Sequence, residues 1–201
     1  MSDTTAAPPE TVARPLRADA RRNRERILKA ARAVFAEHGR EAQMDDVARR
    51  AKVGVGTLYR HFPTKEALLQ GIAVDKFVRL ERIACQARDT ISDPWEAVST
   101  ALWDGAEQLA ADRALFDVLG DANPSAECAS ARTCVRATFE QLLTRAQAAG
   151  AVRDDVTVDH VPLIMMGVGA AIRAADGDEA RWRTYFRVVL DGLRAPYPGG
   201  Q

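Results

Sequence analysis

The sequence predicts an all-α protein, with an N-terminal helix-turn-helix domain followed by a larger helical domain. Three observations support this. Apolar residues recur every three or four positions through most of the 201 residues, and no segment alternates as a strand does. Gly, Pro, Asp and Ser interrupt these periodic segments at helix-length intervals. Residues 44–65 form two short amphipathic segments joined by a glycine-containing turn.

The N-terminal end is predicted to be a disordered arm over residues 1–18, because it contains three prolines and few apolar side chains. A first helix is expected from Ala20 to His38. Asp19 suits its N-terminal cap and Gly39 its C-terminal stop. The helix-turn-helix domain is therefore predicted to span residues 19–64.

Residues 44–65 contain the features that two closely crossing helices need. Val47 and Ala51 supply small apolar contacts on the first helix, and Leu58 faces inward on the second. In the turn, Gly54 is expected to take an unusual backbone angle. An ordinary helical hairpin would share these packing residues. The run Tyr59, Arg60 and His61 beside a buried Leu instead favours a helix lying on a DNA backbone. Thr64 is expected to cap the next helix.

The stretch from about Arg21 to Leu69 resembles the DNA-binding domain of the TetR/AcrR family of bacterial repressors. The matching runs are Glu37-His38-Gly39, Met44-Asp45-Asp46-Val47-Ala48, Gly56-Thr57-Leu58-Tyr59-Arg60-His61-Phe62 and Lys65-Glu66-Ala67-Leu68. Residues 146–156 resemble the ligand domains of the SbtR-like subgroup. The DNA-contacting residues expected from the motif and the resemblance are Arg21, Arg22, Gln43, Met44, Gly54, Val55, Gly56, Thr57, Tyr59, Arg60, His61 and Lys65.

Two positions depart from the family pattern. Gln43 stands where the family often has Ser or Thr, and Gln caps a helix less well although it can bond a phosphate. Val55 stands where a polar or basic residue is common. A valine makes no hydrogen-bonded base contact, but it can pack on a thymine methyl group.

The charge of the chain is divided between its ends. Residues 1–65 hold 14 Lys or Arg and 8 Asp or Glu, whereas residues 66–201 hold 14 and 20, so the formal net charge is zero. A basic N-terminal end is what DNA binding requires. Three cysteines without metal or redox spacing and no signal peptide indicate a reducing cytoplasm. The longest largely apolar run, 161–172, is too short to span a membrane.

The second domain is predicted over residues 65–194, followed by a tail at 195–201. Its helices are expected at about 65–90, 94–111, 112–119, 125–149, 158–175 and 178–194. Asp93 and Pro94 form a cap and first helical position, and Gly150 ends a helix. The last two helices are too apolar for a solvent face. They predict a homodimer through a four-helix interface, with the alternative that both faces serve the chain's own core.

The residues expected at this dimer interface are Ile164, Val168, Ile172, Trp182, Phe186, Val189 and Leu193. The domain is also expected to enclose a cavity for a small, largely apolar effector, although aromatic residues and Met at this spacing are more often plain core. The expected lining residues are Phe77, Trp103, Phe116, Arg136, Phe139, Met165 and Met166.

These features favour a ligand-responsive transcriptional repressor that binds a palindromic operator and is released by its effector. An enzyme is excluded, because no metal-ligand spacing, glycine-rich phosphate loop or nucleophile motif is present. No cofactor is expected. An architectural or effector-independent DNA-binding protein and a transcriptional activator remain as alternatives.

Overall fold

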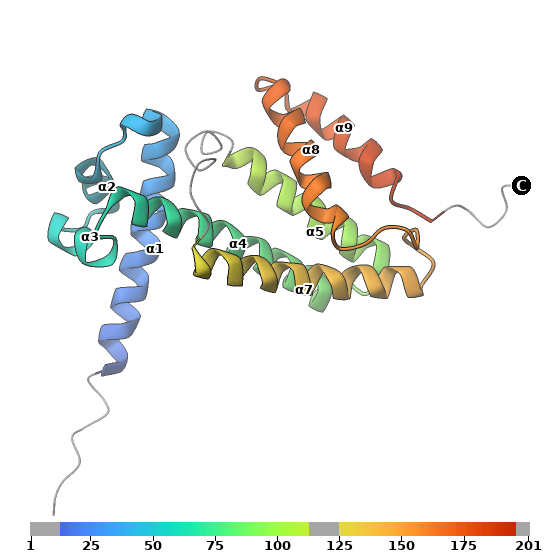
Figure 1. Ribbon diagram of the computed structural model, residues 1–201, viewed down its shortest axis with the longest axis horizontal. Helices are drawn as coiled ribbons and strands as arrows, with labels where there is room; N and C mark the ends of the chain where they lie inside the picture. The colour runs from blue at the N-terminus through green and yellow to red at the C-terminus, as the bar shows by residue number, and fades with distance from the viewer. Residues whose placement is uncertain (1–12, 113–124, 196–201) are drawn as a thin grey trace, which may run out of the picture. The chain divides into compact units, whose positions relative to one another are not determined.

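The computed structural model describes residues 13–112 and 125–195, and the all-α class is confirmed there. Within these residues the only strand-type pairing is one bridge between Val152 and Arg194. The elements are α1 (Ala13–His38), a 3-10 turn η1 (Gly39–Glu41), α2 (Met44–Ala51), α3 (Val55–His61), α4 (Lys65–Thr90), α5 (Pro94–Ala111), α7 (Ala126–Ala148), α8 (His160–Ala174) and α9 (Glu179–Asp191) (Figure 1).

The first of two compact units ends at Leu68 and contains α1, α2, α3 and the first turn of α4. α1 packs on α2, and α2 packs on α3. Ile27, Phe35 and Leu58 are completely or almost completely buried in the shared core. α3 has only seven residues. A helix that short is not stable in water by itself, so its position depends on this packing.

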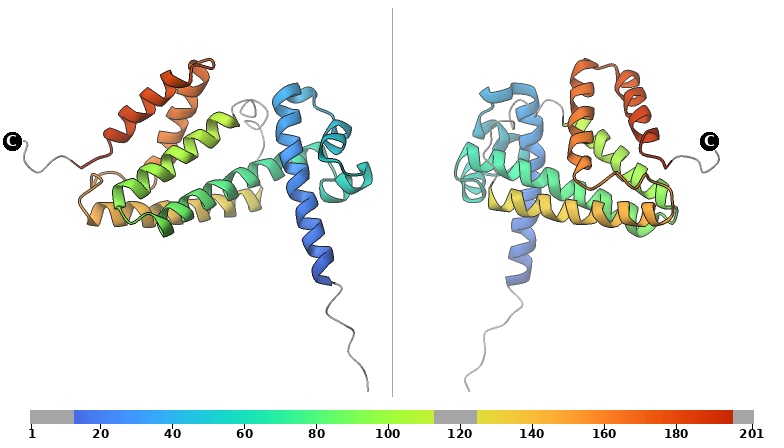
Figure 2. Two further views of the ribbon diagram at one scale, coloured as in Figure 1. Left: turned by 180° about the vertical axis from the view of Figure 1, so that it is seen from behind. Right: turned by 45° about the vertical axis from the view of Figure 1, so that its right-hand side comes forward.

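The second unit begins at Leu69 and contains the rest of α4 together with α5, α7, α8 and α9. Its α4 and α7 run side by side, and α8 and α9 form an antiparallel pair (Figures 1 and 2). α5 contacts both α7 and α8. Leu102, Leu142, Val168 and Phe186 from four different helices meet in one core, where each is at most 1% exposed.

Side-chain caps fix where three of these helices begin. Asp93 accepts a hydrogen bond of 2.8 Å from the backbone N–H of Glu96, and Pro94 occupies the first helical position, as predicted. Ser125 and Asp178 accept equivalent bonds at the starts of α7 and α9. Gly150 follows α7 with a φ of +65°, a backbone conformation that glycine adopts without strain. The observed bounds of α4 and α5 match those expected from sequence.

The start of α1 differs from the prediction. The helix begins at Ala13, so a disordered arm over residues 1–18 is wrong for residues 13–18. Asp19 lies inside the helix and pairs with Arg22 instead of capping it. Pro15 is compatible with this because it falls in the first turn, where the missing N–H has no partner to lose. Residues 1–12, most of the predicted helix at 112–119 and most of the tail at 195–201 lie outside the described residues.

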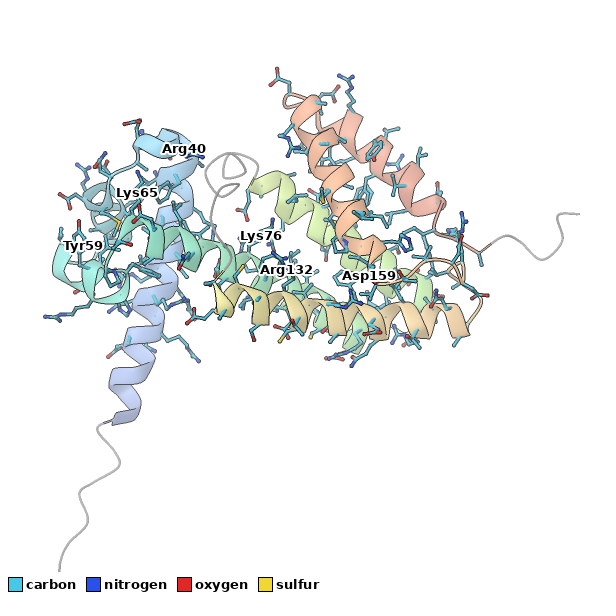
Figure 3. The ribbon with its side chains drawn as sticks, in the orientation of Figure 1. Arg40, Tyr59, Lys65, Lys76, Arg132 and Asp159 are labelled. Atoms are coloured by element: carbon cyan, nitrogen blue, oxygen red, sulfur yellow. The ribbon has the colours of Figure 1, made fainter. Side chains whose placement is uncertain are left out.

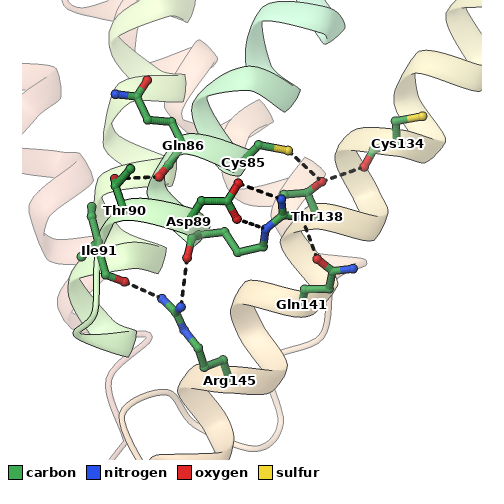
Figure 4. A network of polar contacts seen from close by, with 10 residues as sticks. Cys85, Gln86, Asp89, Thr90, Ile91, Cys134, Thr138, Gln141 and Arg145 are labelled. Carbon is green, nitrogen blue, oxygen red and sulfur yellow. Dashed lines mark hydrogen bonds and ion pairs between the residues drawn. The ribbon is translucent and has the colours of Figure 1, made fainter.

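A polar network joins the end of α4 to α7 (Figure 4). Arg145 on α7 donates to the backbone carbonyls of Arg88 at 3.1 Å and Ile91 at 3.0 Å, which satisfies acceptors at the end of α4. Arg88 in turn donates to Gln141 on α7. The hydrogen bonds from Arg88 also hold the pKa of the Asp89 carboxyl below its usual value. The network fixes α4 against α7 at this end of the unit.

Candidate nucleic-acid interface

The turn between α2 and α3 is built around a left-handed residue at Lys52. Lys52 has φ 55° and ψ 45°, and its N–H bonds back to the carbonyls of Ala48 and Arg49. The expectation that Gly54 takes the unusual angle is wrong, because Gly54 is extended at φ −64° and ψ 144°. Gly54 instead occupies the N-cap position of α3, where its carbonyl accepts from Thr57 and Leu58.

An arginine from α1 closes this turn. Nη2 of Arg26 donates to the backbone carbonyls of Ala51 and Lys52, each at 2.8 Å. These carbonyls lie at the C-terminal end of α2, where the last C=O groups have no backbone N–H partner within the helix. The charged donor therefore ties α1 to the helix-turn-helix turn. Local sequence offered no sign of this role, because the partners lie 25 and 26 residues away along the chain.

The outer face of α3 is free of the unit's core. Leu58 is fully buried, whereas the side chains of Val55 and Tyr59 are 45% and 44% exposed. Arg60 and Gly56 are also exposed. A Cβ added at Gly56 would meet no atom within 4 Å, so the backbone can be approached closely there. Thr57 and His61 lie half-buried beside this surface. The structure thus brings six of the expected DNA-contacting residues onto α3.

Two expected residues at the start of α2 behave differently. Met44 is only 9% exposed and packs inward with Val47, Ala48 and Ala51, so its assignment as a DNA contact is corrected. The reason is helical spacing, since these four residues share one face of α2. Gln43 remains exposed at the N-cap position but makes no capping bond. Its Nε2 donates to the carbonyl of Glu41.

The remaining expected residues lie on α1 and at the start of α4. Arg21 and Arg22 are exposed and pair with Glu25 and Asp19 on the same helix. Exposed ion pairs of this kind are weak, so both arginines can exchange their partners for phosphates. Lys65 begins α4, where Thr64 caps the helix as predicted through a bond from Ala67 N–H.

The ammonium group of Lys65 already has contacts inside the first unit. It donates to the carbonyl of Arg40, and it lies 5.6 Å from the centroid of the Phe35 ring. Figure 3 shows Lys65 close to Arg40, with Tyr59 on the outer side of the same unit. A phosphate contact by Lys65 stays a prediction.

Both halves of the chain match known regulators. Residues 27–72 match the family of bacterial regulatory proteins named after TetR, and residues 93–195 match the C-terminal domain of SbtR-like transcriptional regulators. The chain belongs to the TetR family. A TetR transcription regulatory protein from Mycobacterium vanbaalenii is 37% identical, with 90% of this chain and 100% of that one aligned and a TM-score of 0.70. A TetR transcriptional regulator from Streptomyces coelicolor is 28% identical, with 87% of this chain and 99% of that one aligned and a TM-score of 0.70.

Two curated relatives match over less than a third of this chain. The HTH-type transcriptional repressor KstR of Mycolicibacterium smegmatis is 48% identical over 62 residues, 30% of each protein. The HTH-type transcriptional regulator UidR of Escherichia coli K12 is 43% identical over 58 residues, 28% of this chain and 30% of UidR. The match thus spans less than a third of these relatives' length. The family and these relatives are transcriptional regulators, not enzymes. Among the described residues, no helix is long and apolar enough to cross a membrane.

The second unit of this TetR-family chain corrects most of the expected dimer residues. Val168, Ile172, Trp182, Phe186 and Leu193 are each at most 8% exposed within the chain's own core. Ile164 and Val189 are half-buried against the same core. The exposed apolar side chains of α8 and α9 are instead Leu163, Met166, Tyr185 and Val188. Both faces of α8 are apolar, so sequence periodicity alone did not show which of them points inward.

The expected effector-lining residues divide in a similar way. Trp103 stacks on Phe186 with ring centroids 5.5 Å apart, and Phe139 and Met165 join the same core. Met166 is 69% exposed, and Arg136 is exposed in an ion pair with Asp159, so both are corrected as lining residues.

The other two expected lining residues complete the set. The ring of Phe77 has the guanidinium of Arg132 5.5 Å from its centroid. Phe116 lies outside the described residues.

Proposed function

We propose that this chain is a TetR-family repressor that binds a palindromic operator as a homodimer and leaves it when a small molecule binds. The outer face of α3 is the observation that carries the proposal. It presents Val55, Gly56, Tyr59 and Arg60 together on a short helix that is held by a buried Leu58 and by the turn that Arg26 closes. An α-helix of this kind fits the major groove of DNA.

The residue types suit distinct parts of a DNA site. Tyr59 and Arg60 offer an O–H donor and a guanidinium for phosphate oxygens, as do Gln43, Arg21 and Arg22 around them. Val55 and Thr57, at the N-terminal end of α3, would face base edges. Val55 has only apolar atoms in its side chain, so a thymine methyl group is its natural partner.

The exposed face of α8 and α9 supports a homodimer. Leu163, Met166, Tyr185 and Val188 form an apolar surface with one aromatic hydroxyl, a composition typical of interface centres. We assign this surface to a second copy of the chain, because two α3 helices related by a two-fold axis match the two half-sites of a palindromic operator. A single seven-residue reading helix makes too few base contacts for specific binding.

The effector is proposed to act through α4, which contributes its first turn to the first unit and its remainder to the second. A molecule that binds one arrangement of the dimer better than the other shifts the population by its differential affinity. Apolar and aromatic residues such as Trp103, Phe139 and Met165 favour a largely apolar effector. A cytoplasmic location belongs to the same proposal.

The test is DNA binding by fluorescence anisotropy, with the intergenic DNA beside the protein's own gene and random DNA of equal length. A repressor gives tight binding to the first, saturating at an even number of chains per site and falling steeply with salt. Equal, weak binding to both DNAs would instead identify an architectural binder. A reporter gene behind the same DNA separates repression from activation, and loss of binding in a small-molecule screen tests release.

A further inference from the structure

A surface pocket of about 300 Å³ lies within the second unit, between the end of α5 and the α8–α9 turn. Its volume is at the lower end of the range for small-molecule sites. None of the expected effector-lining residues that the structure describes lines this pocket. The lining residues are Glu107, Ala110 and Ala111 from α5, Ile172 from α8, Gly177 from the turn, and Glu179 and Trp182 from α9.

The pocket combines apolar walls with two carboxylates. Ile172 and Trp182 are each 3% exposed, so they offer the pocket part of an otherwise buried apolar surface. Glu107 and Glu179 approach it from two different helices, and no Lys or Arg is among the lining residues that lie in the described part of the chain. An anion bound here would lie next to two negative charges. The lining therefore favours a positively charged or neutral occupant.

The carboxylates of Glu107 and Glu179 share one neighbouring arginine, which leaves some of their hydrogen-bond acceptor positions open. Nη2 of Arg183 lies 3.1 Å from each carboxylate oxygen of Glu107 and 3.1 Å from one carboxylate oxygen of Glu179. Its guanidinium also lies 5.4 Å from the centroid of a Trp182 ring, and its buried Nε has no hydrogen-bond partner among the described residues. A carboxylate can accept several hydrogen bonds, and here one nitrogen serves both groups. In the described part of the chain, two carboxylates at the pocket therefore share one guanidinium.

We propose that this pocket binds a small organic cation with an apolar body. The cationic group would occupy the positions left open on Glu107 and Glu179, where charge-assisted hydrogen bonds or close ionic contact are strongest. The apolar body would cover the parts of Ile172 and of the Trp182 indole that line the pocket. This site is additional to the proposed effector site, and it does not require that its occupant release DNA.

The first experiment titrates benzyltrimethylammonium into the full-length protein and follows both heat and tryptophan fluorescence. Trp182 lines the pocket and should report occupancy directly. We expect saturable binding of this cation, at least fivefold weaker binding of neutral 2-phenylethanol, and no binding of the anion phenylacetate. No saturable binding of the cation, or equal affinity for the cation and the alcohol, would overturn the proposal.

Three variants locate the site, and each is checked for its helical content. Glu107→Gln and Glu179→Gln should each weaken binding of the cation by up to about fivefold, since the Glu107 side chain is 35% and the Glu179 side chain 73% exposed to solvent. Ala111→Leu adds bulk at an exposed lining position and should abolish binding. Glu140→Gln, an exposed change on α7, is the matched control and should leave affinity unchanged. Wild-type affinity in all three pocket variants would place the cation elsewhere and reject the site.

Operator anisotropy on the same samples separates this site from the proposed function. Binding of the cation that depends on Glu107 and Glu179 establishes the pocket whether or not DNA binding changes. A protein that binds the cation but no operator would refute the repressor and retain the pocket. A protein that binds its operator but shows no saturable binding of the cation would retain the repressor and refute the pocket.

Discussion

The Tyr185 hydroxyl of α9 lies directly against the backbone of Gly167 on α8. A Cβ built on Gly167 would come within 3.0 Å of Tyr185 Oη, closer than such atoms ordinarily approach. Tyr185 is 43% exposed and belongs to the apolar surface that we assign to a second copy of the chain. The absence of a side chain at residue 167 therefore sets the position of an aromatic residue on that surface.

Gly167→Ala should weaken the dimer more than it weakens the fold. The added methyl group displaces the flexible end of Tyr185, while Ala gains about 1 kcal/mol of helix propensity over Gly. We expect the dimer dissociation constant to rise about tenfold in sedimentation equilibrium, equivalent to about 1.4 kcal/mol. Gly56→Ala, at an exposed helical glycine with open space around it, is the control and should not change dimerisation. An unchanged dissociation constant for Gly167→Ala would remove Tyr185 from the interface.

The two apolar faces of α8 and α9 should respond differently to mutation. Met166→Glu places a charge on the exposed face and should give a helical monomer, because a buried unpaired charge disfavours association. Phe186→Ala removes a fully buried ring and should lower the free energy of unfolding by about 3–5 kcal/mol. Sedimentation and urea denaturation at several protein concentrations distinguish the effects. A Met166→Glu protein that remains dimeric would contradict the assigned face.

Arg26→Ala should lower operator affinity without changing its salt dependence. The substitution leaves the carbonyls of Ala51 and Lys52 without their charged donor, which costs about 1–3 kcal/mol. The turn loosens and α3 loses its fixed position. Arg26 is committed to these carbonyls, so no phosphate contact is lost and the slope of log K against log salt is retained. Arg22→Ala, at a nearby surface position, is the comparison. A reduced slope in Arg26→Ala would show that Arg26 contacts DNA.

Lys52→Gly and Lys52→Ala test the left-handed residue in the turn. Both changes remove the same charge, so their difference reports only the backbone. Glycine adopts φ 55° without strain, whereas alanine does not, and we expect the Gly variant to be more stable by about 1 kcal/mol. Thermal unfolding of the two variants measures this. Equal stability would mean that the turn relaxes out of the left-handed conformation.

The sequence predicted what depends on local pattern and missed what depends on distant contacts. The starts of α4 and α5 followed from Thr64 and Asp93, because a capping side chain and its backbone partner are three residues apart. The exposed residues of α3 followed from helical spacing around Leu58. The bond from Arg26 to Ala51 did not, because only folding brings these residues together. The exposed apolar face of α8 was missed for a similar reason, since α8 has two apolar faces and only tertiary packing distinguishes buried Val168 from exposed Met166.

Arg60→Ala and Tyr59→Phe should separate the electrostatic and neutral parts of DNA recognition. Both residues are exposed on α3, so neither change should affect folding. Loss of one cation that neutralises a phosphate reduces the slope of log K against log salt by about 1. We expect this for Arg60→Ala, with weaker binding to operator and random DNA alike. Tyr59→Phe removes a neutral donor, so affinity should fall while the slope stays as in the wild type. If Arg60→Ala kept the full slope, the outer face of α3 would not lie on the DNA backbone, and the proposed orientation of the helix in the groove would have to be abandoned.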